Sequence, residues 1–113
     1  MKEVKAIIQP HQLSRVLDRL HQLPHFAGVT VSDCQGQGRG RGAGGHYEPA
    51  EDTVFFAKKV KLELFCSDAE VEHVVHSIRE AAHTGNPGDG IIVVVDLDRA
   101  VRIRSGEEQD RAV

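Results

Sequence analysis

The chain has 113 residues, which allows one domain with one modest hydrophobic core. Apolar residues make up 40 % of it, but aromatic residues only 4 %, so the core must be built from Val, Ile, Leu and Ala. The 14 Lys and Arg against 17 Asp and Glu give a net charge of −3, which argues against a general nucleic-acid-binding protein, and no apolar run reaches the length of a membrane span.

The first part of the chain predicts a strand, a helix and a second strand. Residues 3–9 alternate between polar and apolar side chains, as a half-buried strand does. Between Gln12 and Leu23 the apolar residues recur at helical spacing, which predicts an amphipathic helix. Residues 29–35 begin with β-branched side chains and alternate again, so we expect the second strand there.

A glycine-rich segment follows the second strand. Six glycines lie between Gly36 and Gly45, interleaved with Arg39 and Arg41. Such a segment buries too little to offset the entropy of ordering it, so the sequence predicts a long mobile loop that extends to about Asp52. Loops of this length in a compact domain are usually functional or disordered. We therefore weigh a partner-docking arm against a dispensable insertion.

The second part of the chain repeats the order of the first. Residues 54–66 predict a strand, and Ser67 or Asp68 is expected to cap the helix that follows. Residues 91–95 form a continuous apolar run, which predicts a strand buried on both faces. Residues 101–104 alternate and are expected to be extended as well.

The order of these elements predicts the fold class. It corresponds to an α+β, ferredoxin-like βαββαβ sandwich, with all of residues 1–113 in a single domain. Both helices would cover one face of the sheet, so self-association is the economical way to cover the other face. Within the domain, residues 37–55 are the expected flexible loop, residues 84–90 a glycine-rich turn, and residues 98–113 a C-terminal segment.

Two features are candidates for binding an anion. The turn from Thr84 to Gly90 contains three glycines, and its backbone N–H groups can form a concave nest, although a tight connection between a helix and a strand is the simpler interpretation. Arg102 and Arg104 leave a strand on the same face and can converge on one polyanion, although they also fit a solvated edge strand. Together they favour a phosphate site, because such a site needs both donors and charge.

Other chemistry finds less support in the sequence. Of the seven histidines, His73, His76 and His83 lie opposite the apolar stripe of the second helix, as on a solvated face. His46 in the glycine-rich loop is the one weak metal-ligand candidate, and no set of residues has zinc-site spacing. No serine or cysteine lies in an activating motif, so we do not expect an enzyme.

The two cysteines suggest the compartment. Cys34 and Cys66 are far apart in sequence and do not form a CxxC motif. The chain opens directly on a strand pattern, with no signal peptide before it. We therefore expect two free thiols in a cytoplasmic protein.

Several segments resemble the nitrogen-regulatory P-II family. They are KEVKAIIQP, GVTVSDCQGQGRG, KVKLEL, HTGNPGDGIIVV and AVRIRSGEE, and they span nearly the whole chain. TGxxGDG followed by VRIRxGE is a specific combination. The resemblance implies a homotrimeric signal-transduction protein that binds ATP, ADP or AMP in the clefts between subunits. It would regulate a membrane transporter or an enzyme in nitrogen utilization, through the T-loop at residues 37–55, without being embedded in the membrane itself.

The resemblance also assigns nucleotide-binding residues by position. The adenine and ribose would lie near Ile7, Gly28, Val29, Thr30, Glu63 and Leu64. The phosphates would meet Gly88, Asp89, Gly90, Arg102 and Arg104, with Gly36, Gly38 and Arg39 at the base of the T-loop. Lys59 matches the lysine that pairs with 2-oxoglutarate in the family, so it is the residue implied for a co-ligand.

Departures from the family pattern change which ligands and modifications we expect the protein to respond to. Ile91 replaces a common lysine, so the site should prefer fewer phosphates or bind ATP more weakly. Gly40 replaces a glutamine that helps to hold magnesium with 2-oxoglutarate, so whether this protein binds magnesium and 2-oxoglutarate stays open. Asp52 occupies the position of the tyrosine that is uridylylated in enteric relatives, so that switch is absent. The co-ligand stays open between 2-oxoglutarate, bicarbonate, a metal and another metabolite. The alternative function is a metal- or metabolite-responsive trimer with weak or no nucleotide dependence.

Overall fold

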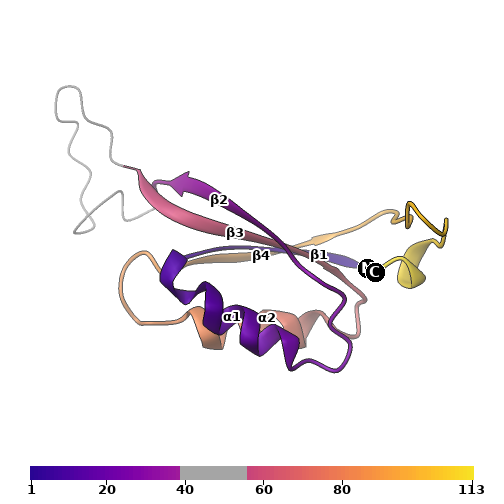
Figure 1. Ribbon diagram of the computed structural model, residues 1–113, viewed down its shortest axis with the longest axis horizontal. Coiled ribbons are helices and arrows are strands. Elements are labelled where there is room, and N and C mark those ends of the chain that lie inside the picture. The colour runs from indigo at the N-terminus through magenta and orange to yellow at the C-terminus, as the bar shows by residue number, and fades with distance from the viewer. Residues whose placement is uncertain (39–55) are drawn as a thin grey trace.

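The computed structural model of the protein describes residues 1–38 and 56–113, so the predicted loop falls almost entirely outside it. In chain order the described elements are β1 (Lys2–Ile8), a short 3-10 helix (Pro10–Gln12), α1 (Leu13–His21), β2 (Thr30–Gly36), β3 (Ala57–Cys66), α2 (Val71–Ala82), β4 (Gly90–Asp96) and a second short 3-10 helix (Gln109–Arg111). The strands form one sheet in the order β2-β3-β1-β4, and every neighbouring pair is antiparallel. Both helices cover the same face of this sheet (Figure 1). This is the predicted ferredoxin-like α+β arrangement.

The central strands β1 and β3 supply the sheet side of the core. Their register pairs Val4 with Leu64 and Ala6 with Leu62, so the apolar side chains of both strands lie on the helix-covered face. Val4, Ala6 and Leu62 have no exposed surface. The alternation seen in the sequence is therefore explained by a sheet with one covered and one open face.

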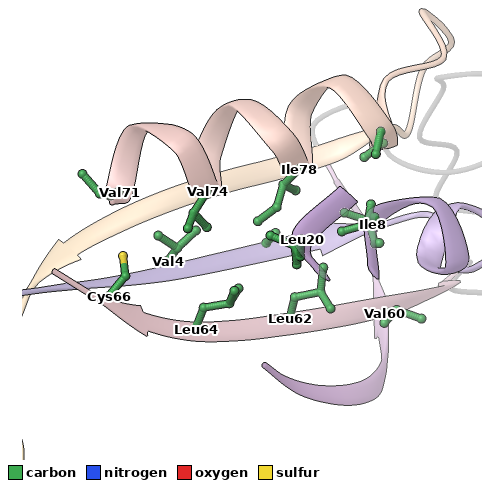
Figure 2. Packing of buried hydrophobic residues seen from close by; sticks show 14 residues of the cluster. Val4, Ile8, Leu20, Val60, Leu62, Leu64, Cys66, Val71, Val74 and Ile78 are labelled. Atoms are coloured by element: carbon green, nitrogen blue, oxygen red, sulfur yellow. The ribbon is translucent and has the colours of Figure 1, made fainter. Parts of the chain in front are cut away.

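The helices complete the core from the other side. Val16 and Leu20 of α1 and Ile78 of α2 are fully buried. Val74 and Ile78 point from α2 toward β1, and Leu20 belongs to the same buried cluster as Ile8 (Figure 2). Burial of each such side chain contributes roughly 1.5–3 kcal/mol, so the amphipathic stripes hold the helices on the sheet. Among the described residues, no helix is long and apolar enough to cross a membrane.

The predicted cap of α2 is wrong. The helix begins at Val71, after Glu70, and no side chain makes a capping hydrogen bond. The Asp68 carboxylate instead accepts a hydrogen bond from the N-terminal ammonium of Met1, at 2.8 Å. That hydrogen bond and the charge of the ammonium hold the pKa of Asp68 below its usual range. A contact with the far end of the chain has replaced the local one.

The expectation that residues 91–95 are buried on both faces is also wrong for the single subunit. Ile91 is 60 % exposed and Val95 is 48 % exposed. The reason is the sheet order: β4 is an edge strand that pairs with β1 alone, while the core is built over β1 and β3. Ile92 packs partly against that core. The run is apolar, but most of it is left uncovered.

Residues 101–104 do not form the predicted strand. Val101 makes an isolated bridge with Glu108, and the intervening chain turns back on itself. The Arg102 N–H donates to the Glu107 carbonyl, and the Gly106 N–H donates to the Arg102 carbonyl, both at 2.8 Å. The reversal uses Gly106, whose φ of 76° lies in the left-handed region that favours glycine. The alternation of residues 101–104 therefore belongs to a folded turn.

Candidate anion-binding site

The turn at residues 84–90 joins α2 to β4 and lies at the end of the sheet where β1 finishes (Figure 1). Gly85, Gly88 and Gly90 have φ angles of 90°, 91° and 110°, a region that other residues adopt only with strain. A Cβ on Gly90 would also lie 1.7 Å from the Ile7 carbonyl oxygen. Glycine at position 90 is therefore required for the pairing of β4 with β1.

The carboxylate of Asp89 organises this turn from within. It accepts hydrogen bonds from the Thr84 N–H at 2.8 Å, from the Gly85 N–H at 2.9 Å and from the Thr84 hydroxyl. The hydroxyl makes the largest contribution, and together these donors lower the pKa of Asp89. The carboxylate is thus held in its charged form by the residues at the start of the turn.

Donor groups gather at the middle of the turn. The Lys59 ammonium donates to the Gly88 carbonyl at 2.6 Å. Within residues 1–38 and 56–113, the N–H groups of Gly88 and Asp89 have no hydrogen-bond partner. The side-chain amide of Gln9 is also close, because a Cβ on Gly88 would lie 2.9 Å from Gln9 Nε2. This concentration of N–H groups and one ammonium suits an anion.

Gln9 was not identified from the sequence. It carries no motif, and it reaches the turn because β1 ends beside β4, where Ile8 is paired with Gly90. The signal that could have identified it is positional: Gln9 is the last residue of the predicted first strand, and it directly follows β1 in the structure. Only the pairing of that strand with β4 turns this position into a neighbour of the turn.

The residues expected near the adenine separate into two groups. Thr30 and Glu63 are register partners, and they share the open face of the sheet with Ile7. Leu64, in contrast, is only 2 % exposed and faces the helices, so it can offer a ligand its backbone alone. Gly28 and Leu64 line a small hollow beside Phe26, near the start of β2, and Val29 packs partly against the core.

The base of the predicted T-loop lies at the same end of the sheet as the glycine turn. Gly36 is paired with Ala57, and a Cβ on Gly36 would lie 3.7 Å from Lys59 Cγ. Gly38 is the last described residue before the gap. Arg39 and His46, which the sequence analysis named as a phosphate contact and a metal-ligand candidate, lie outside the described residues.

Arg102 and Arg104 lie at the other end of β4. The C-terminal segment that carries them follows Asp96, whereas the glycine turn precedes Gly90, and the two appear at opposite ends of the molecule (Figure 1). A strand of this length spans about 20 Å. Both arginines line a hollow of about 670 Å³ together with Phe65. The structure therefore does not bring the two predicted anion-binding features together within one subunit.

The cysteines and the helix histidines are placed as the sequence indicated. Cys34 and Cys66 are both free thiols. His73 and His76 are exposed on α2, where they approach Glu70 at 3.5 Å and Glu80 at 4.0 Å. No group of three His, Cys, Asp or Glu residues suited to a metal ion occurs in the part of the chain that the structure describes.

The sheet order and the single helical layer define a ferredoxin-like α+β protein, and comparison with known proteins gives its family. The family described as "P-II: Nitrogen regulatory protein P-II" matches residues 1–107. Nitrogen regulatory protein P-II of Azospirillum brasilense is 42 % identical over 113 residues, and that of Pasteurella multocida is 41 % identical over 113 residues, with all of both chains covered in each case. The crystal structure of Arabidopsis thaliana PII bound to citrate has a TM-score of 0.80 and 33 % identity, covering 99 % of this chain and 91 % of that one. The chain therefore belongs to the nitrogen regulatory P-II family.

Membership confirms the resemblance found in the sequence and the class of function expected from it. Proteins of this family are trimeric signalling regulators of partner proteins, they bind adenine nucleotides, and they are not enzymes. The expectation of a signal-transduction protein rather than an enzyme is thus confirmed.

Proposed function

We propose that this protein is a homotrimeric cytoplasmic regulator that binds ATP, ADP or AMP between neighbouring subunits. The observation that carries the proposal is the separation of two complementary half-sites on one subunit. The turn at residues 84–90 offers N–H donors at one end of β4, and Arg102 and Arg104 offer charge about 20 Å away at the other. A polyanion that uses both half-sites must lie between two copies of the chain.

The open face of the sheet supports a base-binding region next to the turn. Ile7 is paired with Ile91, which immediately follows the turn, and Glu63 lies one row further along the same face. The Ile7 side chain offers an apolar surface to a flat ring, and the Glu63 carboxylate can accept a hydrogen bond from an amino group. An adenine seated there would direct its phosphates toward Gly88, Asp89 and Gly90.

Ile91 favours the less charged nucleotides. It is a neutral side chain beside the turn and is 60 % exposed in the single subunit, so it adds no charge to the site. The ammonium that contacts the turn is that of Lys59, and it is already bonded to the Gly88 carbonyl. We therefore expect ADP or AMP to compete well with ATP in this protein.

Lys59 is also the residue that we propose for a carboxylate co-ligand. The Arabidopsis relative binds citrate, a tricarboxylate, which is consistent with binding of organic acids in this family. A carboxylate at Lys59 would have to share or replace the bond to Gly88. Because Lys59 lies in β3, two residues after its start at Ala57, such a ligand would act next to residues 37–55, through which we propose that the protein regulates a transporter or an enzyme.

Calorimetry with ATP, ADP and AMP tests the nucleotide proposal. The wild type should bind at least one of them at micromolar to millimolar concentration, and Arg102→Ala/Arg104→Ala should weaken binding by at least about tenfold, because charge-assisted hydrogen bonds to phosphate are lost. Arg15→Ala/Arg79→Ala is the matched control, since it removes the same charge from the exposed helical surface. A wild type that binds none of the three nucleotides at millimolar concentration would show that the proposal is wrong.

A further inference from the structure

The turn at residues 84–90 contains an acidic residue at the place where phosphates are proposed to bind. A free carboxylate there would repel a polyanion, so its position needs a physical reason. In the structure both oxygens of Asp89 are directed at donors within the turn: Oδ2 accepts from the N–H groups of Thr84 and Gly85, and Oδ1 accepts from the Thr84 hydroxyl. The negative charge is therefore already matched by local donors.

The Thr84 hydroxyl links two parts of the turn. It donates to Asp89, and it accepts a hydrogen bond from the Asn86 N–H at 3.1 Å. One hydroxyl therefore uses both its donor and its acceptor capacity to fix the first half of the turn against the second. A side chain of the same shape without the hydroxyl would lose both bonds.

The Gly88 carbonyl at the centre of the turn is occupied as well. The Gly88 carbonyl accepts from Lys59 Nζ at 2.6 Å. The N–H groups of Gly88 and Asp89, in contrast, have no partner within the described ranges 1–38 and 56–113. The Gly88 carbonyl and the Asp89 carboxylate are thus bonded within the subunit, while the N–H groups of Gly88 and Asp89 are left available.

From this arrangement we infer that Asp89 and Thr84 are positioning residues, whose side chains bind no ligand themselves but hold the turn so that the N–H groups of Gly88 and Asp89 stay available to one. The inference rests on the proposed nucleotide site and deepens it. Asp89 would contribute to phosphate binding through its backbone N–H, while its side chain acts inward on Thr84 and Gly85. An acidic residue then supports anion binding, because it is bonded to donors that do not face the ligand.

Calorimetry with ADP on three variants tests this inference. Asp89→Asn and Thr84→Val should each weaken ADP binding by about tenfold or more, because each removes at least one hydrogen bond to a charged group. Thr84→Ser keeps the hydroxyl and should bind ADP within about twofold of the wild type. Valine has the shape of threonine and serine is smaller, so binding that is kept by serine and lost with valine would depend on the hydroxyl and not on side-chain volume.

Amide hydrogen exchange without nucleotide provides a second, local measurement. Asp89→Asn should accelerate exchange of the Thr84 and Gly85 amides, whose acceptor is the Asp89 carboxylate, and leave the amides of β1 unchanged. Unchanged exchange at Thr84 and Gly85 would overturn the inference. Acceleration throughout β1 would also overturn it, because the role would then be general stability.

The calorimetric outcomes separate the inference from the proposed function. If the wild type binds ADP and both Asp89→Asn and Thr84→Val bind it equally well, the inference is wrong and the nucleotide site stands. If Asp89→Asn binds ADP more tightly, the carboxylate faces the phosphates and the inference is again wrong. A wild type that binds no ADP, ATP or AMP overturns the proposed function and this inference with it.

Discussion

The two ends of β4 are held in different ways. At Gly90 the backbone approaches β1 so closely that no side chain fits, and the preceding turn is fixed by internal hydrogen bonds to Asp89. At the other end, the C-terminal segment folds back on itself through a backbone hydrogen bond between Arg102 and Glu107 and through the exposed ion pair of Arg99 with Glu108, and Ile103 is fully exposed. The glycine end is thus organised within one subunit, whereas the arginine end carries an apolar side chain that one subunit leaves uncovered. This difference is what a site shared between subunits would require.

The largest expected effect is a loss of stability caused by backbone strain, which should differ between the two ends of β4. Gly90→Ala should lower the free energy of unfolding by roughly 3–5 kcal/mol, because it combines a left-handed φ with a severe overlap at the Ile7 carbonyl. Gly106→Ala in the C-terminal segment is the matched control: its φ is 76°, but a Cβ there meets no atom within 4 Å. It should cost about 1–2 kcal/mol. Urea unfolding measures both, and equal losses would contradict the contrast between the ends.

Mixed trimers test whether the two ends belong to one shared site. Gly88→Val should damage the turn, because a Cβ there lies 2.9 Å from Gln9 Nε2 and φ is 91°, while Arg102→Ala/Arg104→Ala damages the other half-site. Neither variant alone should bind ADP well. When the two are unfolded and refolded together, each mixed trimer should regain one site, so an equal random mixture should recover about a quarter of all sites.

Calorimetry on the refolded mixture measures this recovery. Each variant refolded alone is the control, and it should remain as weak as before refolding. A mixture that binds no more ADP than its two components would mean that no interface combines an intact turn with intact arginines. The half-sites would then not be complementary parts of one site.

A smaller effect is expected from adding charge at the glycine end. Ile91→Lys places an ammonium next to the turn and should strengthen ATP binding by about 1–2 kcal/mol, or roughly tenfold, with less gain for AMP, because the attraction grows with the number of phosphate charges. Ile91→Gln is a control that adds a polar end without charge. Calorimetry at low and moderate salt should show that the gain shrinks as salt rises. An equal gain for ATP and AMP would place Ile91 away from the outer phosphates.

Local sequence patterns were sufficient for the central part of the fold. The alternation in β1 and β3 identified the buried faces because those strands have helices on one side and an open face on the other. The patterns failed where distant contacts decide the structure. Asp68 could not be recognised as a partner of the chain terminus, and the alternation around Arg102 gave no sign that Glu107 would turn it back.

In the candidate site, too, the sequence predicted local features and missed those that depend on distant contacts. The glycine turn was identified from its composition, because a cluster of glycines indicates backbone positions with left-handed φ. The same sequence does not show that Asp89 points inward to Thr84, or that Gln9 lies beside Gly88, because both follow from the three-dimensional arrangement of the turn beside β1. The adenine-region residues were named from the family resemblance, whereas Arg102 and Arg104 were first named from the alternation of residues 101–104. The joint role of these residues stays a prediction.

The smallest expected effect concerns the ion pair that ties the C-terminal segment. Arg99 donates to Glu108 Oε1 through Nε at 2.9 Å and through Nη2 at 2.5 Å, but the two side chains are 70 % and 49 % exposed. A pair this exposed contributes about 0.2–1 kcal/mol and is screened by salt. Glu108→Gln should therefore lower the free energy of unfolding by that amount at low salt and by almost nothing at 1 M NaCl.

Asp110→Asn is the matched control for this measurement. It removes a carboxylate from the same segment, and within residues 1–38 and 56–113 this carboxylate has no ion-pair partner. It should leave stability nearly unchanged at either salt concentration. A loss above about 2 kcal/mol for Glu108→Gln, or one that persists at high salt, would mean that the C-terminal segment is fixed as firmly as the glycine turn. The arginines would then be preorganised within a single subunit, and the contrast between the two ends of β4 would no longer support the proposal that the site is shared between subunits.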